Sequence, residues 1–280
     1  MSTGWGLIQI TRPHNCLAAA LASLLGAYLS GGSAHLLSSP VVRAATVVGL
    51  TVGACNVAND YRDVAADRVD KPHRPIPSGR VSRRAAEKLA VVLTLAALGV
   101  AGTLGRWPAA IALTTAILGI GYSHCLKSTV LLGNGVIGLL CGATVIYGGL
   151  AAGDLTPQVG VAGLLISLFV FTREILKALA DRRGDISAGV RTVATQFGTP
   201  VSLRLFQTFA IVFVVAALAP WFLHLAGDRY LYAMVPGSIL PTVVIAILLG
   251  LRLTDHTIHL SLRVTKWLWF SSLSAMVLLK

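Results

Sequence analysis

Charged residues are scarce in this sequence. Asp, Glu, Lys and Arg make up 12% of its 280 residues, whereas they make up about a quarter of a typical soluble globular chain. Hydrophobic residues account for 55% of the chain, its mean hydropathy is +0.76, and apolar runs extend along its whole length. This is more apolar sequence than a water-soluble core needs, so the composition predicts a polytopic membrane protein.

Acidic residues are scarcer than basic ones: there are 11 Asp and Glu against 23 Lys and Arg, which gives a net charge of +12. The basic residues lie in short segments between apolar runs rather than along one soluble face, so nucleic acid is not an expected partner. The first apolar run leads into a long predicted helix without a small-residue cleavage site, so we expect no cleaved signal peptide.

Several motifs of other protein classes are missing as well. The sequence has no Gly-rich nucleotide loop, no nucleophile elbow and no haem-attachment motif. Asp255, His256 and His259 are close in sequence, and we expect a solvated loop there rather than a metal site. The cysteines form no Cys-x-x-Cys pair, so we expect isolated thiols in packed helices rather than disulfides or metal ligands. These cysteines are Cys16, Cys55, Cys125 and Cys141.

Apolar runs of about 20 residues, the length that spans a bilayer, dominate the chain. We predict nine of them, at about 14–31, 38–58, 85–104, 107–124, 131–151, 158–180, 204–225, 231–251 and 264–279. The predicted fold is an all-α bundle of about nine transmembrane helices, in a single domain over residues 1–280. Within it we expect two pseudo-repeat halves, at about 11–124 and 131–225, followed by C-terminal helices at 231–279.

The distribution of charge predicts the orientation of the bundle. If the N-terminus and the connections after the second, fourth, sixth and eighth spans share one side, that side holds 19 of the 23 basic residues and nine of the 11 acidic ones. By the positive-inside rule this side is cytoplasmic. We therefore expect an integral protein of the cytoplasmic or inner membrane, with its N-terminus and active face toward the cytoplasm. The four remaining basic residues are Arg43, Arg106, Arg229 and Lys280.

Two segments on the cytoplasmic side, 59–85 and 181–202, are longer than a turn requires. Each contains Asp-x-x-x-Asp after an even-numbered span, and the equivalent aspartates Asp63 and Asp181 are 118 residues apart. This pattern predicts an internal repeat, with two similar half-sites that face each other across the bundle.

The spacing of the acids predicts a metal site. Asn59, Asp63 and Asp67 follow one another at i, i+4 and i+8, which places them on one stripe of a continuing helix, and Asp181 and Asp185 repeat the spacing. Carboxylates at membrane depth are costly, so these four need a cation, and an oxygen-only ligand set favours Mg²⁺ over zinc. The array suits Mg²⁺ ions that hold a diphosphate between the half-sites. The alternative is that the acids pair with neighbouring arginines, namely Arg62, Arg68, Arg182 and Arg183.

These motifs resemble those of a known family. NDYRDVAAD (59–67) resembles the N-D-x-x-D-x-x-x-D signature of the UbiA-type intramembrane prenyltransferases, and DRRGD (181–185) resembles their second D-x-x-x-D. Other segments resemble the digeranylgeranylglyceryl phosphate synthase-like branch of that superfamily: TRPHNCLAAALASLLGAYL, HRPIPSGRVS, YSHCLKSTVLLGN and REILKALADRRGDISAGVRT. The resemblance runs from about residue 11 to residue 198, and beyond about residue 200 only the hydropathy agrees.

The resemblance implies a nine-helix, Mg²⁺-dependent enzyme. Such enzymes bind an isoprenyl diphosphate, here farnesyl or geranylgeranyl diphosphate, and break its C1–O bond. They then pass the allylic cation to a lipophilic acceptor, while the prenyl tail lies in an apolar tunnel. Metal ions and cationic side chains neutralise the leaving diphosphate, and the bundle interior keeps water away from the cation.

The resemblance also assigns roles by position. Asp63, Asp67, Asp181 and Asp185 would hold Mg²⁺, and Asn59 would contact the diphosphate or the metal shell. The implied phosphate and substrate contacts are Lys127, Arg74, Arg68, Tyr122, Lys177 and Asn15.

Three residues of the predicted site have a second interpretation. A structural ion pair is the alternative role for Lys177, and an interhelical hydrogen bond is favoured for Asn15. Asp60 points away from the predicted stripe and carries less weight.

The sequence departs from the family pattern near the expected acceptor site. Ala178 and Ala180 stand where the branch usually has acids, and YSHCLK lacks the Pro and Arg of the Y-P-x-x-K-R motif of ubiquinone-type members. A UbiA-type terpene cyclase, in which the cation attacks the substrate's own double bonds, is therefore the alternative function. A transporter is a third hypothesis, but its broken helices at mid-membrane are not expected where the polar residues collect at one end. Prenyl chain length, acceptor and oligomeric state stay open.

Overall fold

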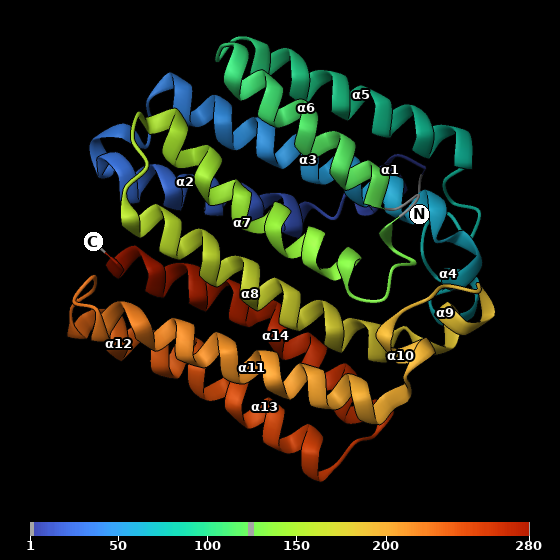
Figure 1. Cartoon of the computed structure of the whole chain (residues 1–280). Coiled ribbons are helices and arrows are strands. Elements are labelled where there is room, and N and C mark those ends of the chain that lie inside the picture. Colours follow the sequence, from blue (N-terminus) through green and yellow to red (C-terminus); the bar gives the residue numbers. More distant parts are fainter. Residues whose placement is uncertain (1–2, 123–125, 280) are drawn as a thin grey trace.

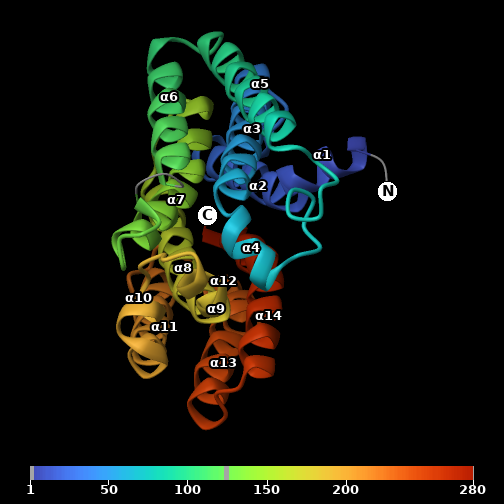
Figure 2. The same ribbon diagram turned by 90° about the vertical axis from the view of Figure 1, so that its right-hand side faces the viewer.

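The structure, a computed structural model that describes residues 3–122 and 126–279, is a bundle of long helices that lie side by side (Figures 1 and 2). The described residues contain no strand. The long helices are α2 (Pro13–Gly31), α3 (Ser39–Arg62), α5 (Arg83–Gly102), α6 (Arg106–Gly121), α7 (Leu132–Ala152), α8 (Pro157–Ala180), α11 (Gly198–Phe222), α13 (Leu240–Leu251) and α14 (Asp255–Met276). The short elements are α1 (Thr3–Thr11), η1 (Ser33–His35), α4 (Val64–Asp70), α9 (Arg182–Ser187), α10 (Val193–Gln196), α12 (Asp228–Met234), η3 (Val235–Ile239) and η4 (Val277–Leu279).

The helices follow the predicted apolar runs closely. Within the described residues, each predicted span overlaps a helix, and α12, η3 and α13 together form the run predicted at 231–251. Among the residues that the structure describes, six helical segments are long and apolar enough to cross a membrane: α3, α5, α7, α8, α11 and Asp228–Leu251. These six confirm the prediction of an all-α membrane protein, while the number of nine crossings stays a prediction.

One predicted loop is wrong. Asp255, His256 and His259 lie on the first two turns of α14 rather than in a loop, because the helix begins nine residues before the predicted span. A capping box explains the early start: the Thr254 side chain accepts from the backbone N–H of Thr257, and the Thr257 side chain accepts from the backbone of Thr254. No group of three or more His, Cys, Asp or Glu side chains forms a preassembled metal cluster among the described residues.

Small residues let α2, α7 and α8 approach one another closely. A Cβ on Gly26 or Gly148 would overlap a backbone carbonyl of the facing helix, that of Val145 or Ser23. Glycines at such positions allow helix backbones to pack tightly in a membrane, where no hydrophobic effect drives association.

The sequence Gly138-x-x-x-Gly142 on α7 is a motif typical of close helix packing in a membrane. A Cβ on Gly138 would come within 2.7 Å of the Ser167 carbonyl on α8, and one on Gly142 would overlap Gly163. The motif is therefore a contact between α7 and α8.

The largest core cluster joins α8 to α11, α13 and α14. Phe169 and Phe213 meet inside it with their ring centroids 5.5 Å apart. Large apolar side chains on the outer faces of the helices remain exposed, among them Leu139, Val215 and Ile247. Apolar outer faces on long helices are typical of a lipid-facing surface.

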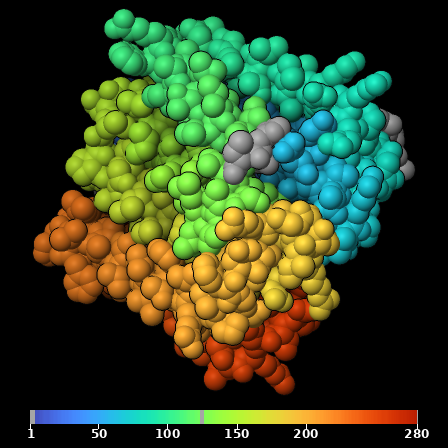
Figure 3. Space-filling model, turned by 45° about the vertical axis from the view of Figure 1, so that its right-hand side comes forward, coloured from blue at the N-terminus to red at the C-terminus, as the bar shows by residue number. Residues whose placement is uncertain are grey.

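The connections that carry the predicted site gather at one end of the bundle. The short helices α4, α9 and α10 lie together at this end, on the right in Figure 1, and α4 packs against α9. In Figure 3 the surfaces of α4, segment 126–131 and α9–α10 meet on one face. We call this the cap end.

The tight α2–α7 contact leads to the first prediction. Gly148→Ala places a methyl group where the Ser23 carbonyl lies, so the helices must separate, at a cost of about 1–3 kcal/mol. We expect a lower unfolding temperature for the purified protein in detergent, followed by circular dichroism. Gly160→Ala in α8 is the matched control, because nothing lies within 4 Å of its added Cβ. Equal unfolding temperatures for the two variants would contradict this account of the contact.

Candidate active site

Each Asp-x-x-x-Asp motif begins where a long helix ends. Asp63 follows α3 with φ −81° and ψ 4°, and Asp181 follows α8 with φ −91° and ψ 4°. The two residues therefore share one backbone conformation. The predicted continuous helix from Asn59 to Asp67 is wrong at Asp63, where α3 gives way to α4. The backbone bonds from Asp63 to Asn59 (2.9 Å) and from Asp67 to Asp63 (2.8 Å) nevertheless keep the helical turn across the break.

The two motifs face each other through α4 and α9. The backbone N–H of Gly184 donates to Asp70 Oδ2 at 2.9 Å. A side chain on Gly184 would overlap that carboxylate and lie 2.9 Å from the Ala66 carbonyl oxygen. The glycine inside DRRGD therefore permits the close approach of the two half-sites.

In the first half-site, side chains from α3 and from two loops bind the carboxylates of Asp63 and Asp67. Lys127 Nζ donates to Asp63 Oδ1 at 2.5 Å, and Asn59 Nδ2 donates to Asp63 Oδ2 at 2.9 Å. Arg74 Nη1 donates to Asp67 Oδ2 at 2.7 Å. Burial raises the pKa of Asp67, and the adjacent Arg74 opposes that rise.

In the second half-site, one aspartate is paired with a cation and the other is not, within the described residues. Lys71 Nζ donates to Asp181 Oδ1 at 2.6 Å, which ties the loop after α4 to the second motif. Burial of Asp181 acts to raise its pKa. The pKa is nevertheless lowered, because Lys177 and Lys71 stabilise the carboxylate. Asp185 is 4% exposed and makes no ion pair within the described residues. Burial raises its pKa to about 6, against the opposing effect of Lys127.

A third group of charges was not expected from the sequence. Asp60 is buried and forms ion pairs with Arg12 and, at 3.3 Å, with Arg74. Because Arg74 also binds Asp67, Asp60 belongs to the same network, although it lies off the predicted stripe. Arg12 lies in the left-handed region at φ 53°, in the break between α1 and α2. The ion pair between Arg12 and Asp60 can be recognised only in the tertiary structure. In the sequence, the Arg12–Pro13 pair indicates only the break between α1 and α2.

The predicted alternative, pairing with neighbouring arginines, is wrong. Arg183 pairs with Asp255 at 2.8 Å on the exposed surface, and Arg182 Nε donates to the Ala194 carbonyl at 3.0 Å. Arg62 and Arg68 are exposed. The aspartates instead pair with residues that arrive from loops: Lys71, Arg74 and Lys127.

The remaining predicted residues lie around this cluster. Tyr122 is buried at the end of α6, and its carbonyl accepts from the Lys127 backbone at 2.9 Å. Lys177 donates to Glu174 at 3.3 Å, which is the structural ion pair considered above. Asn15 is half-buried in the first turn of α2, and no interhelical bond from its side chain is found in the described residues. Cys125 and Lys280 lie outside the described residues.

The donor set fits a hard divalent cation. The four aspartates offer only oxygen atoms, and the cap end contains the amide of Asn59 beside them. Mg²⁺ takes one or two carboxylates and completes its shell with water and phosphate oxygens, and each half-site offers two aspartates.

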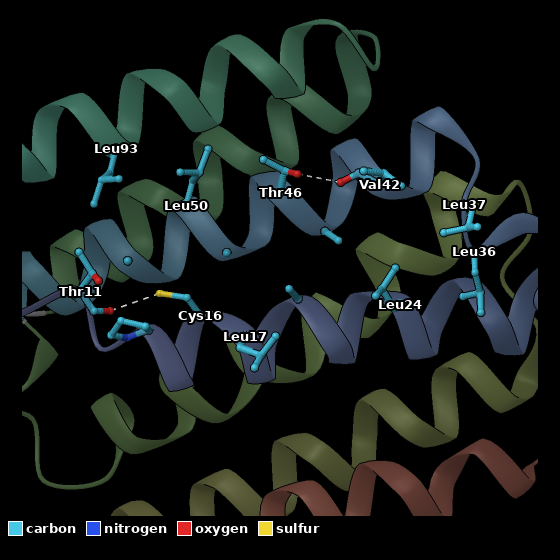
Figure 4. Close-up of a pocket in the computed structure, with 15 residues that line it drawn as sticks. Thr11, Cys16, Leu17, Leu24, Leu36, Leu37, Val42, Thr46, Leu50 and Leu93 are labelled. Atoms are coloured by element: carbon cyan, nitrogen blue, oxygen red, sulfur yellow. Dashed lines mark hydrogen bonds between the residues drawn. The ribbon is translucent and has the colours of Figure 1, made fainter. Parts of the chain in front are cut away.

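An apolar groove of about 570 Å³ runs between α2 and α3 (Figure 4). Its lining extends from Leu36 and Leu37 at one end to Thr11 at the cap end, and Leu93 of α5 closes one side. Asn56 donates to the Thr11 carbonyl at 2.9 Å beside the mouth of the groove. The groove therefore ends one residue from Arg12 in the charged network.

The sequence is similar to a group of curated enzymes. Residues 17–271 match the family model described as "UbiA prenyltransferase family". The digeranylgeranylglyceryl phosphate synthase of Halobacterium salinarum is 34% identical over 248 residues, which cover 88% of each chain. The enzyme of the same name from Methanopyrus kandleri is 35% identical over 231 residues, covering 82% of this chain and 84% of the other.

Solved structures show the same fold. A digeranylgeranylglyceryl phosphate synthase structure superposes with a TM-score of 0.75 at 26% identity and covers 99% of this chain and 98% of the other. A UbiA homolog from Archaeoglobus fulgidus bound to GPP and Mg²⁺ has a TM-score of 0.72 at 17% identity, with 96% and 99% coverage. At that identity the second likeness concerns the fold alone.

The contact between the half-sites leads to the second prediction. Gly184→Ala forces α9 away from Asp70 and Ala66 and so moves the carboxylates of the two motifs apart. We expect Mg²⁺ binding to weaken about tenfold, or about 1.4 kcal/mol, by calorimetry on the purified protein. Gly99→Ala is the control, because its added Cβ meets nothing within 4 Å. Unchanged Mg²⁺ affinity in Gly184→Ala would contradict this role for the glycine.

Proposed function

The chain belongs to the UbiA prenyltransferase family, and we propose that it transfers the prenyl group of an isoprenyl diphosphate to a glyceryl phosphate that already carries one prenyl chain. The observation that carries the proposal is the meeting of two Asp-x-x-x-Asp motifs and three loop cations, Lys71, Arg74 and Lys127, at one end of an apolar bundle. The name shared by the curated relatives supports the acceptor class.

Mg²⁺ is the proposed cofactor. Asp63 and Asp67 would hold it from the first half-site, and Asp181 and Asp185 from the second, with Asn59 beside them. When bound, Mg²⁺ neutralises negative charge on the leaving diphosphate. The likeness to the UbiA homolog bound to GPP and Mg²⁺ supports the choice of metal.

The basic residues of the site have a second task once the carboxylates hold metal. Lys127 and Lys71 lie within 2.6 Å of Asp63 and Asp181, so small movements of these flexible side chains would bring them to diphosphate oxygens. Arg74, held between Asp60 and Asp67, can offer two parallel donors to a phosphate. Charge-assisted hydrogen bonds of this kind strengthen as the C1–O bond breaks and charge grows on the leaving group.

The surroundings protect the allylic cation. Tyr122 is buried at the cap end, and the helices beneath the charged network are apolar along their length. Excluding water in this way prevents capture of the cation before the acceptor hydroxyl attacks C1, which forms the new ether bond and releases a proton.

We further propose that the cap end faces the cytoplasm. The excess of basic residues in the connections at this end supports that orientation. A single cysteine introduced at the exposed position Ala188, in a chain whose four native cysteines are replaced, should react with an impermeant thiol reagent only in inside-out vesicles. A cysteine at Gly105, in the connection between α5 and α6, is the control and should react only in right-side-out vesicles. The reverse pattern would contradict the orientation.

Product analysis tests transfer against cyclisation. Purified protein with Mg²⁺ and geranylgeranyl or farnesyl diphosphate should release little diphosphate alone, and should form a second ether bond when geranylgeranylglyceryl phosphate is added. Mass spectrometry of the lipid extract identifies the product. A cyclic hydrocarbon formed without acceptor would overturn the transfer reaction; the naming of the curated relatives as synthases of a glyceryl phosphate lipid weighs against that outcome.

The two half-sites should be equally necessary. Asp63→Asn and Asp181→Asn each remove a negative ligand while keeping size, so turnover should fall by about a hundredfold or more. The loss should appear in diphosphate release as well as in prenyl transfer. Asp154→Asn, at the opposite end of the bundle, is the matched control. Near-normal activity of either site variant, with a normal unfolding temperature, would sink the two-half-site arrangement.

A further inference from the structure

A second group of basic side chains lies away from the aspartates, where α2, α8 and α14 meet. His14 is on the first turn of α2, Arg173 is two turns before the end of α8, and Lys266 is in the middle of α14. The helices α2 and α14 each pack against α8 and against each other, and Figure 2 shows α14 below α2. None of these three residues takes part in the diphosphate site described above.

Helix packing brings Arg173 and Lys266 together. The rings of Phe169 and Trp269 contact each other with centroids 6.2 Å apart. Arg173 lies one turn after Phe169, and Lys266 lies nearly one turn before Trp269, so the antiparallel helices bring the two cations to the same level. Arg173 and Thr265 line one small cavity, which agrees with this register.

His14 joins the same cluster from α2. It lies on the first turn of α2, and α2 packs against both α8 and α14. Its neighbour in sequence, Arg12, is paired with Asp60. The side chains of His14 and Lys266 are exposed, so a ligand can reach both of them.

Positive charge in this cluster is not balanced by the protein. Glu174 is the nearby carboxylate, and it lies 3.6 Å from Arg173 and 3.3 Å from Lys177, so one acid serves two cations. Within residues 3–122 and 126–279, no ion pair involves Lys266 or His14. The diphosphate site, by contrast, pairs most of its acids with bases. An anion from outside the protein would balance the excess.

The depth of the cluster suits a lipid headgroup. Arg173 is eight residues before Asp181, about 12 Å along the helix, so the cluster lies deeper than the aspartates. Lys266 is followed directly by Trp267, which is 70% exposed, and the remaining residues of α14, up to Met276, carry no charge. A lysine next to an exposed tryptophan is typical of the membrane interface, where lipid phosphates lie.

We infer that His14, Arg173 and Lys266 bind the phosphate of the acceptor lipid and orient its glycerol toward the cap end. The inference rests on the proposed function and adds a recognition site for the second substrate. Arg173 can form paired hydrogen bonds to a phosphate, and Lys266 and His14 add single donors. With the phosphate held here, the chains of the lipid extend into the bilayer and its hydroxyl points toward the diphosphate site. The cluster therefore selects phosphate-bearing lipids over neutral ones.

Lipid binding without catalysis tests the inference. Purified full-length protein in detergent, with EDTA and no isoprenyl diphosphate, is titrated with hexadecylglycerol phosphate and with hexadecylglycerol, and binding is followed by thermophoresis. We expect the phosphate lipid to bind at least about tenfold more tightly than the alcohol. Lys266→Met should remove most of that preference, and Lys266→Arg should restore it. The control Arg263→Met changes an exposed cation on the same helix and should change binding less than about twofold.

Two results would overturn the inference: equal affinity of the native chain for the two lipids, or equal effects of Lys266→Met and Arg263→Met. Because Lys266 is exposed, its loss should not impair folding, and the unfolding temperature checks this. In turnover assays Lys266→Met should raise KM for the phosphate-bearing acceptor and leave KM for the isoprenyl diphosphate unchanged. If the chain formed no ether product yet bound the phosphate lipid through Lys266, the proposed function would fail and the binding site would stand. If the chain formed the ether product normally and Lys266→Met changed neither lipid binding nor KM, the binding site would fail and the proposed function would stand.

Discussion

The cap end is organised by the need to compensate buried carboxylates at the end of an apolar bundle. Asp60, Asp63, Asp67 and Asp181 are each held by a lysine or arginine, and three of these cations come from loops rather than from the helices that carry the acids. The long connection after α3 returns Lys71 and Arg74 to the aspartates, and the loop after α6 brings Lys127. Charge compensation therefore fixes the paths of both loops.

The same constraint explains the resemblance between the two halves of the site. Asp63 and Asp181 end their helices with nearly the same backbone angles, and each is followed by a short helix. Gly184 lets those short helices touch, through its N–H bond to Asp70. The separation of the two motifs is therefore set by a contact between the Gly184 backbone and the carboxylate of Asp70, a residue outside both Asp-x-x-x-Asp motifs.

Charge also divides the molecule into regions with different tasks. The aspartates and loop cations at the cap end suit a metal and a diphosphate, whereas the cluster on α2, α8 and α14 has an excess of positive charge and suits a phosphate alone. Glu174 and Lys177 lie between the two regions on α8. The apolar groove between α2 and α3 opens beside Arg12, so a long apolar chain could lie against the bundle with its polar end near the charged network. The two amphiphilic substrates proposed above would need such an arrangement, because their heads must meet while their chains stay in the bilayer.

The sequence by itself determined the helices, their approximate limits and the pairing of the two acidic motifs. Apolar runs of membrane length specify helices because the backbone has no other partner in a bilayer, and the spacing of four residues places Asp63 with Asp67 and Asp181 with Asp185. Only the tertiary structure decided which cations these acids meet. Of the arginines adjacent in sequence, Arg183 pairs with the exposed Asp255 and Arg182 donates to the Ala194 carbonyl, while Lys71, Arg74 and Lys127 arrive from loops whose course depends on the packing of the whole bundle. It also decided the role of Asp60, because its partner Arg12 lies 48 residues away. The mutual packing of α2, α8 and α14, which carry His14, Arg173 and Lys266, likewise comes from the tertiary structure, because helix register in three dimensions is not set by local spacing.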